Sequence, residues 1–341
     1  MSEECVLAIE AGGTKCEALL MSIDGTALGF HAVYPNAVAG TGGYGRGREA
    51  NTATHAVEGA LRVCNPEGTL HLACSSYLLT GEIRNLARAR RVLLWNAGEA
   101  ESALAWGGVD DGLVALAGTG AFGYLRLKDR YWRADGIGPL LGDRGGSYQI
   151  GREGLRAVFR PGSTSAVLRE ELIRLEGLSP EEDLEKAMVP LSVRIMGDRT
   201  AVAHYAIIVN RAARRGDPDA IAILEQAADD LSGTIRYLVD KLDVGGRALP
   251  MVGTGGMIRH SDIYWNRLVQ RVAGFLPHVR ALRQDLPQVA GRALAGLGHA
   301  IRNGACHADA AASRERLLAT LPPLLEKIKP LQETPPLPRT A

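Results

Sequence analysis

The sequence predicts an α/β protein built from two similar domains, and three observations support this. A chain of 341 residues is longer than one typical hydrophobic core requires. Short apolar runs of strand length alternate with helical patterns. The same beginning, a strand, a Gly-Thr turn and a second strand, occurs first as "VLAIEAGGTKCEALL" from Val6 and again as "LVALAGTGAFGYLRL" from Leu113. A duplicated domain start is the simplest interpretation.

The first domain is expected to begin with a three-stranded antiparallel meander. Apolar runs at 6–9, 16–22 and 27–33 predict its strands, and Asp24-Gly25 is a strong hairpin signal. Residues 48–63 predict a helix whose apolar face is formed by Ala53, Ala56, Val57, Ala60, Leu61 and Val63. The remaining elements expected in this domain are buried strands at "TLHLACSS" and "RRVLLWN", a short helix near 81–90 between them, and a helix at "SALAWGG".

The second domain is expected to open with the strand "GLVALA" and a hairpin over "YLRLKDRYWR", with Asp129 near its tip. The clearest helix begins after Asp217, which can cap it, and has Pro218 in its first turn. One face of this helix is apolar at Ile221, Leu224, Ala228, Leu231, Ile235, Leu238 and Leu242. "ALPMVGTGGM" predicts a strand that runs into a glycine turn.

These patterns place the first domain at residues 1–112 and the second at 113–287. The small-residue helix near 288–304 is a candidate to pack back on the first domain. Residues 305–341 are assigned to a C-terminal extension, and its Pro-rich end is expected to be disordered. A PxxP ligand is the alternative interpretation of this end.

The composition excludes several classes of protein. A hydrophobic content of 46% and a charged content of 23% are ordinary for a soluble globular protein. A net charge of +1 offers no electrostatic case for nucleic acid. The longest apolar run is shorter than the roughly 18 residues of a spanning helix, and the acidic start "MSEEC" does not resemble a signal peptide. Five scattered cysteines without C-x-x-C indicate reduced thiols, so we expect a cytoplasmic enzyme without a nucleic-acid or membrane partner.

Two matches to G-x-G-x-x-G, at 118–123 and 40–45, raise the question of a dinucleotide-binding turn. Such a turn must lie between a strand and a helix, because the pyrophosphate binds at the helix N-terminus. The first match is followed by a β-hairpin pattern, and the second is preceded by "YPNAVA", whose Pro35 makes a poor central strand. The Rossmann interpretation is therefore rejected. Two glycine-threonine turns, one in each domain, can instead present backbone N–H groups to the phosphates of one triphosphate across an interdomain cleft. The alternative is that each turn is only a tight hairpin.

Five segments in order along the chain carry a family resemblance. They are "AIEAGGTK" (8–15), "AGTGA" (117–121), "GPLLGDRGGSYQIGREGLRA" (138–157), "RAARRGDPDAIAILEQAADDL" (211–231) and "VGTGG" (252–256). Together they resemble the BadF/BadG/BcrA/BcrD-type ATPases, and most of all the N-acetylglucosamine kinase branch of the actin-like superfamily. The resemblance implies two actin-like (ribonuclease H-like) domains that bind ATP and Mg²⁺ in the cleft between them and close on a sugar.

The resemblance also assigns site residues. Its phosphate-binding positions match Gly12, Gly13, Thr14 and Lys15 in the first turn and Gly118, Thr119 and Gly120 in the second. Its adenosine-side loop matches Gly253, Gly255 and Gly256. Glu10 stands where the family has a carboxylate near the metal, which agrees with the preference of Mg²⁺ for hard oxygen ligands. Asn36 and Asp143 match sugar contacts, although a turn-capping role is the alternative for Asp143.

Three departures from the family pattern affect the chemistry. Glu99 occupies the place of the family's general base, an Asp, and is one methylene longer. It would accept the proton of the attacking hydroxyl, and the alternative is a carboxylate that favours the start of a helix. Ala121-Phe122 replaces polar residues that help to bind the sugar in the animal kinases, and Arg144 replaces a common carboxylate. Arg144 could recognise an acidic group on a substrate or be a solvated surface residue.

The sequence therefore predicts an ATP-dependent kinase of an amino sugar or related hexose, with ATP and Mg²⁺ as cofactors and a small sugar as its partner. A homodimer is left open. The alternative function is a nucleotide-driven ATPase switch or regulator that does not phosphorylate a sugar.

Overall fold

The computed structural model describes residues 4–12, 15–33, 46–75, 85–128, 130–162, 165–178 and 184–327. In helices α1 and α6, side chains are described from residues 52 and 188 onward. The chain forms two compact units. Unit 1 comprises the described residues up to Asp110 and from Gln284 onward, and unit 2 runs from Asp111 to Arg283.

Unit 1 contains a five-stranded mixed sheet in the order β3-β2-β1-β4-β5. The first three strands form the predicted antiparallel meander, and β4 and β5 continue the sheet in parallel to β1. The bounds are β1 (Glu4–Ala11), β2 (Cys16–Ser22), β3 (Ala27–Val33), β4 (Thr69–Cys74) and β5 (Arg91–Asn96). The parallel strands β1, β4 and β5 therefore have their carboxyl ends at the same edge of the sheet.

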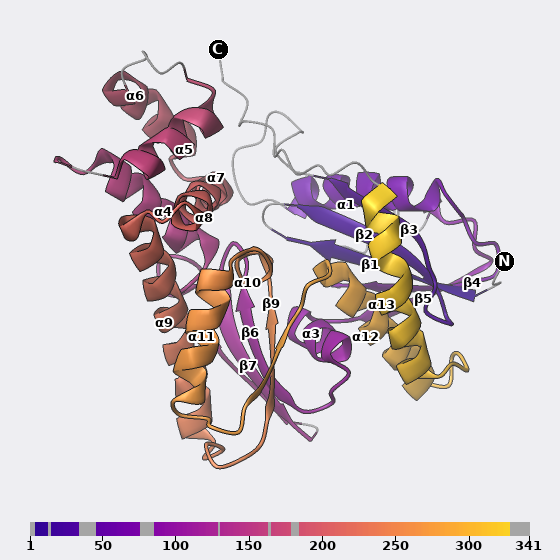
Figure 1. Cartoon of the computed structure of the whole chain (residues 1–341). Coiled ribbons are helices and arrows are strands. Elements are labelled where there is room, and N and C mark those ends of the chain that lie inside the picture. Colours follow the sequence, from indigo (N-terminus) through magenta and orange to yellow (C-terminus); the bar gives the residue numbers. More distant parts are fainter. Residues whose placement is uncertain are drawn as a thin grey trace. The chain divides into compact units, whose positions relative to one another are not determined.

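Both faces of this sheet are covered by helices (Figure 1). Alternate residues of β1 point to opposite faces, so Leu7 packs toward α1 while Val6 and Ala8 pack toward α12 and α13. The helices are α1 (Arg46–Leu61), α3 (Glu99–Gly107), α12 (Gln288–Arg302) and α13 (Ala310–Lys327). The apolar face predicted for α1 is buried, except that Val63 lies beyond the helix end and is exposed.

Unit 2 contains a second five-stranded sheet in the order β10-β9-β6-β7-β8. Its bounds are β6 (Gly112–Ala117), β7 (Ala121–Leu127), β8 (Arg130–Asp135), β9 (Pro250–Thr254) and β10 (Arg280–Arg283). The first three strands again form an antiparallel meander, and β9 and β10 continue the sheet in parallel to β6. The two sheets therefore share one topology, which confirms the duplication read from the sequence.

The helices of unit 2 bury one large apolar core against this sheet. They are α4 (Ser147–Phe159), α5 (Ala166–Glu176), α6 (Leu184–Ile195), α7 (Arg199–His204), α8 (Ala206–Arg214), α9 (Pro218–Lys241), α10 (Gly256–His260) and α11 (Asp262–Ala273). The N-terminal cap predicted for α9 is present, because the Asp217 carboxylate accepts a hydrogen bond from the Ala220 N–H. The series from α4 to α8 is not anticipated by the sequence patterns.

The predicted fold class, an α/β chain of two domains built on the same mixed-sheet topology, is confirmed. The end of the chain differs from the expectation of a separate extension. Helix α13 belongs to unit 1, because Leu317 and Leu321 are fully buried beside the sheet. The helix expected near 288–304 is α12, which packs on the same face. Residues 76–84, Asp129 and 328–341 lie outside the described residues, and 87–90 are not helical.

Candidate functional site

The first glycine turn follows β1 in unit 1. The Gly12 N–H donates a hydrogen bond of 2.8 Å to the Lys15 carbonyl, which closes the turn. The Lys15 ammonium group is ion-paired with the buried Glu17 carboxylate on β2. Gly13 and Thr14 lie outside the described residues. The turn connects two buried strands, so it lies at a fixed edge of the sheet.

Glu10 lies one residue before the end of β1, and its side chain is only 6% exposed. Its counter-charge is Arg292 on α12, whose Nε donates a hydrogen bond of 2.6 Å to Glu10 Oε2 and whose Nη2 contacts the same oxygen. Burial raises the pKa of the Glu10 carboxyl to about 7, while Arg292 opposes the rise and the Glu99 carboxylate adds to it. Within the described residues, no hydrogen bond reaches Glu10 Oε1.

Arg292 is the residue of this site that the sequence analysis does not find. It lies in a helix otherwise rich in alanine and glycine, and an arginine there reads as a surface residue. The structure buries it to 1% exposure. The signal that could have pointed to it is an arginine in the first half of the helix, inside a run of alanine and glycine, whereas Arg302 stands at the helix end.

Glu99 is the first residue of α3, and it is exposed. The Glu99 carboxylate is one of the charges that raise the pKa of Glu10. Gly98 provides no side-chain cap, so a carboxylate in the first turn also favours the helix N-terminus. Glu101 instead lies 2.9 Å from His299 Nε2 on α12.

The second glycine turn joins β6 to β7 in unit 2. The carbonyls of Gly118 and Thr119 accept hydrogen bonds of 2.8 and 3.0 Å from the N–H groups of Ser147 and Tyr148, so the start of α4 supports the turn. The N–H groups of Thr119 and Gly120 have no hydrogen-bond partner within the described residues. Two unpaired N–H groups on a supported turn can bind phosphate oxygens.

Asp143 lies against this turn. Its carboxylate accepts backbone hydrogen bonds from Ala121 and Gly138, which is a turn-capping role, and Arg199 Nη1 lies 3.8 Å from Oδ2. Burial raises the pKa of Asp143, and Arg199 opposes the rise. A Cβ on Gly120 would lie 2.5 Å from Asp143 Oδ2, so glycine is required there by the carboxylate.

The third glycine loop follows β9, which is paired with β6. A Cβ on Gly253 would lie 2.3 Å from the Trp265 ring, so packing of α11 on the strand requires this glycine. Gly255 has a φ of +101°, and a Cβ there would lie 2.3 Å from the carbonyl oxygen of Ala117, the last residue of β6, and 2.9 Å from the Gly118 nitrogen. Gly256 begins α10, and a Cβ there would meet open space. The Gly255 loop and the Gly118 turn are therefore adjacent at one edge of the sheet.

The structure also shows the contacts of Phe122 and Arg144, which mark the other two departures from the family pattern. Phe122 is buried, and the Arg133 guanidinium lies 4.3 Å from its ring centroid, which is a packing role. Arg144 is exposed, with Nε 3.5 Å from Asp135 Oδ2. Asn36, and the glycine pattern at 40–45, lie outside the described residues.

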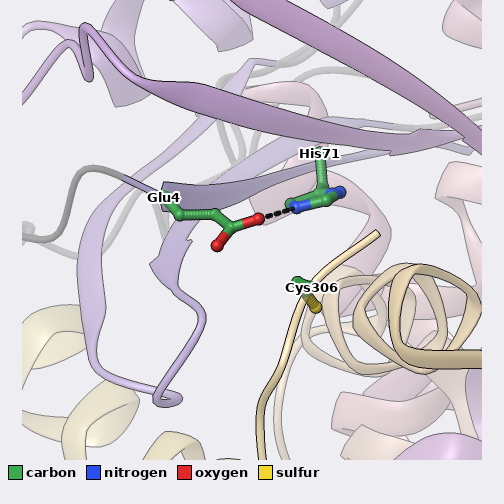
Figure 2. A group of neighbouring side chains, drawn as sticks. All are labelled: Glu4, His71 and Cys306. Carbon is green, nitrogen blue, oxygen red and sulfur yellow. Dashed lines mark hydrogen bonds and ion pairs between the residues drawn. The ribbon is translucent and has the colours of Figure 1, made fainter. Parts of the chain in front are cut away.

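A separate group of three side chains, Glu4, His71 and Cys306, lies at the opposite end of β1 (Figure 2). Their potential metal-ligand atoms lie within 4.8 Å of one another. The Trp95 indole N–H donates to His71 Nδ1 at 3.0 Å, so Nδ1 must accept and Nε2 must carry the ring proton. That proton is donated to Glu4 Oε1, at 2.7 Å. The Nε2 atom that a metal would need is therefore protonated, and Trp95, His71 and Glu4 form a chain of hydrogen bonds.

The residues around Glu10 are suited to Mg²⁺. Glu10 retains one oxygen, Oε1, without a hydrogen bond from the described residues. One or two carboxylates together with substrate phosphates are the usual protein contribution to a Mg²⁺ site. The ion pair with Arg292 reduces the charge that Glu10 offers.

The fold, two α/β units of one sheet topology, is shared with solved structures of other proteins. One similar solved structure is that of a ROK family glucokinase from Streptomyces griseus in complex with glucose and AMPPNP, with a TM-score of 0.60 and 15% identity over 87% of this chain and 99% of that one. Another, from Chromobacterium violaceum, is described as a candidate N-acetylglucosamine kinase and has a TM-score of 0.59 at 20% identity, over 86% of this chain and 98% of that one. These likenesses establish the fold.

Two curated proteins are similar in sequence. The N-acetylmuramic acid/N-acetylglucosamine kinase of Clostridium acetobutylicum is 28% identical over 190 residues, which are 54% of this chain and 60% of that protein. The N-acetyl-D-glucosamine kinase of Dictyostelium discoideum is 30% identical over 193 residues, 54% of this chain and 59% of that protein. The similarity thus spans less than two thirds of either relative. No protein-family model matches the chain, so the BadF-type assignment stays a prediction.

Proposed function

We propose that the protein is an ATP-dependent kinase that transfers the γ-phosphoryl group of ATP to a hydroxyl of an amino sugar or related hexose. The observation that carries this proposal is the pair of carboxylates, Glu10 and Glu99, at the carboxyl edge of the unit 1 sheet beside the first glycine turn. The sugar-kinase fold and the two relatives named as N-acetylglucosamine kinases support it.

Each unit carries one turn for the nucleotide. In unit 2, the N–H groups of Thr119 and Gly120 would donate to phosphate oxygens, and the Gly255 loop would approach the adenosine. In unit 1, the turn from Gly12 to Lys15 would provide the corresponding donors. Glu10 would hold Mg²⁺, which offsets the charge of the phosphates when it is bound.

Glu99 would act as the general base. Its carboxylate is exposed at the start of α3 and can accept the proton of the attacking sugar hydroxyl as the phosphoryl group is transferred. Asp143 would hydrogen-bond a sugar hydroxyl through carboxylate lone pairs that the Ala121 and Gly138 N–H groups do not use. Asn36 is proposed as a second sugar contact on the resemblance alone.

The proposal is tested by ADP release from ATP and Mg²⁺ with N-acetylglucosamine, glucosamine, glucose, N-acetylmuramic acid or buffer alone. Turnover that a sugar stimulates and that Glu99→Gln abolishes is the expected result. Glu101→Gln is the matched control, because Glu101 belongs to the same helix but pairs with His299. ATP hydrolysis that no sugar stimulates would favour the nucleotide-driven switch, and ATP binding without turnover would favour a regulator.

We also infer a cytoplasmic location, since ATP is the proposed substrate and none of the five cysteines, all of which lie in the described residues, forms a disulfide. No helix within the described ranges combines the length and apolar character that crossing a membrane requires.

A further inference from the structure

Arg292 makes more contacts in the candidate site than pairing with Glu10 requires. Its Nε and Nη2 both contact Glu10 Oε2. Its Nη1 donates to Ser75 Oγ at 2.9 Å and to the Ala97 carbonyl at 2.6 Å. All three guanidinium nitrogens of this buried side chain are therefore engaged.

The three acceptors lie at the carboxyl ends of three adjacent parallel strands. Glu10 lies near the end of β1, Ser75 follows β4 directly, and Ala97 follows β5 directly. A guanidinium group is planar and presents its donors at fixed angles. One side chain from α12 therefore holds the ends of β1, β4 and β5 in a fixed relation.

These contacts determine where both carboxylates lie. Because Arg292 binds Glu10 through Oε2 alone, Oε1 is the oxygen left for a ligand. Ala97 is two residues before Glu99, and Gly98 gives α3 no side-chain cap. The hydrogen bond from Arg292 to the Ala97 carbonyl is thus a restraint on the segment that leads into Glu99.

Stability alone is a weak reason for such an arrangement. A buried ion pair often contributes no more than well-packed apolar residues of the same volume, and the other α12 residues in this core are apolar. A requirement to place a carboxylate oxygen accurately does explain a guanidinium with four contacts.

We propose that Arg292 is the positioning residue of this site, which directs Glu10 Oε1 toward the ligand and fixes the start of α3 so that Glu99 meets the sugar hydroxyl. The proposal rests on the proposed function for its catalytic consequence. Arg292 would act through these residues and not on a substrate, because it is 1% exposed and protein groups accept four of its five N–H donors.

The test is Arg292→Lys, which keeps the charge but cannot reach all three acceptors. Since a displacement of about 1 Å can cost on the order of a hundredfold in rate, kcat should fall by about that factor, while KM for ATP changes by less than about threefold. In the wild type, the Ala97 N–H donates to the Cys74 carbonyl and the Ser102 N–H to the Gly98 carbonyl. In Arg292→Lys, hydrogen exchange at the backbone N–H groups of residues 97–102 should become faster.

The matched control is Arg314→Lys. Arg314 Nε donates a hydrogen bond of 2.6 Å to the Trp106 carbonyl. Trp106 lies near the C-terminal end of α3, the helix that begins at Glu99. This variant should leave kcat and exchange at 97–102 unchanged. If Arg292→Lys folds poorly, Ser75→Ala serves as a second variant. It removes only one of the three acceptors of Arg292, so kcat should fall by a smaller factor.

Two results would overturn the positioning role: an unchanged kcat per folded molecule in Arg292→Lys, or unchanged exchange at 97–102. If the wild-type protein phosphorylates no sugar, the proposed function fails, and the exchange rates alone decide the positioning role. Faster exchange at 97–102 in Arg292→Lys but not in Arg314→Lys would then still support it.

Discussion

Replacing Arg292 by Met removes the only cation in contact with the buried Glu10 carboxylate among the described residues, and we expect it to destabilise unit 1 strongly. The two side chains are 1% and 6% exposed, so water cannot replace the guanidinium. Breaking a buried pair by removing one partner costs about 3–5 kcal/mol. The Ala97 carbonyl also loses its 2.6 Å donor, which moves the expected cost toward the upper end of this range.

A loss of this size is measurable by thermal or urea unfolding. At roughly 2–4 °C per kcal/mol for a domain of 150–250 residues, the transition of unit 1 should fall by about 6–20 °C. The double variant Glu10→Met/Arg292→Met removes both charges, so we expect it to recover about 2–4 kcal/mol relative to Arg292→Met. The reasoning is refuted if the double variant is no more stable than the single one, because the cost would then not come from an unpaired carboxylate.

Three further predictions concern other parts of the molecule. Gly120→Ala should lower Tm, because the added Cβ would lie 2.5 Å from Asp143 Oδ2. Gly118→Ala should leave Tm unchanged, because the nearest atom to its Cβ, Leu116 Cδ2, lies 3.9 Å away. Equal Tm values for the two variants would contradict this prediction. Asp143→Asn should raise KM for the sugar more than KM for ATP in steady-state kinetics, and an unchanged sugar KM would leave Asp143 only its turn-capping role. The hydrogen bond from Ser22 lowers the pKa of Asp24 from 3.8 to about 2, so its contribution to stability is present above about pH 4 and is lost as the pH falls toward 2. Urea unfolding of wild type and Asp24→Asn should therefore converge in that interval, and a constant difference would argue against the assignment.

Local patterns in the sequence are sufficient for most of the framework. The two meanders follow from apolar alternation and turn residues, and the capped helix α9 follows from Asp217 and its apolar face. Glu10 lies near the carboxyl end of β1, and Glu99 begins the helix that follows the parallel strand β5 in the same sheet.

Other features depend on contacts between distant segments. The sequence assigns the region of α13 to a C-terminal extension. The burial of Leu317 and Leu321 shows that this helix is part of the core of unit 1. Asp143 is a turn residue and a candidate sugar ligand in the sequence, and only its bonds to Ala121 and Gly138 show that it caps the turn. The glycines at 120 and 253 are explained by a carboxylate and an indole ring from other elements.

The sequence by itself determined the duplicated α/β framework, the two glycine turns and the carboxylate types at the site, because periodicity and turn chemistry are properties of neighbouring residues. Only the tertiary structure decided the electrostatics of that site. The cation that neutralises Glu10 comes from Arg292, on a helix far along the chain, and its effect depends on burial that no local pattern encodes. Whether a carboxylate is free, paired or shifted in pKa is therefore decided by folding.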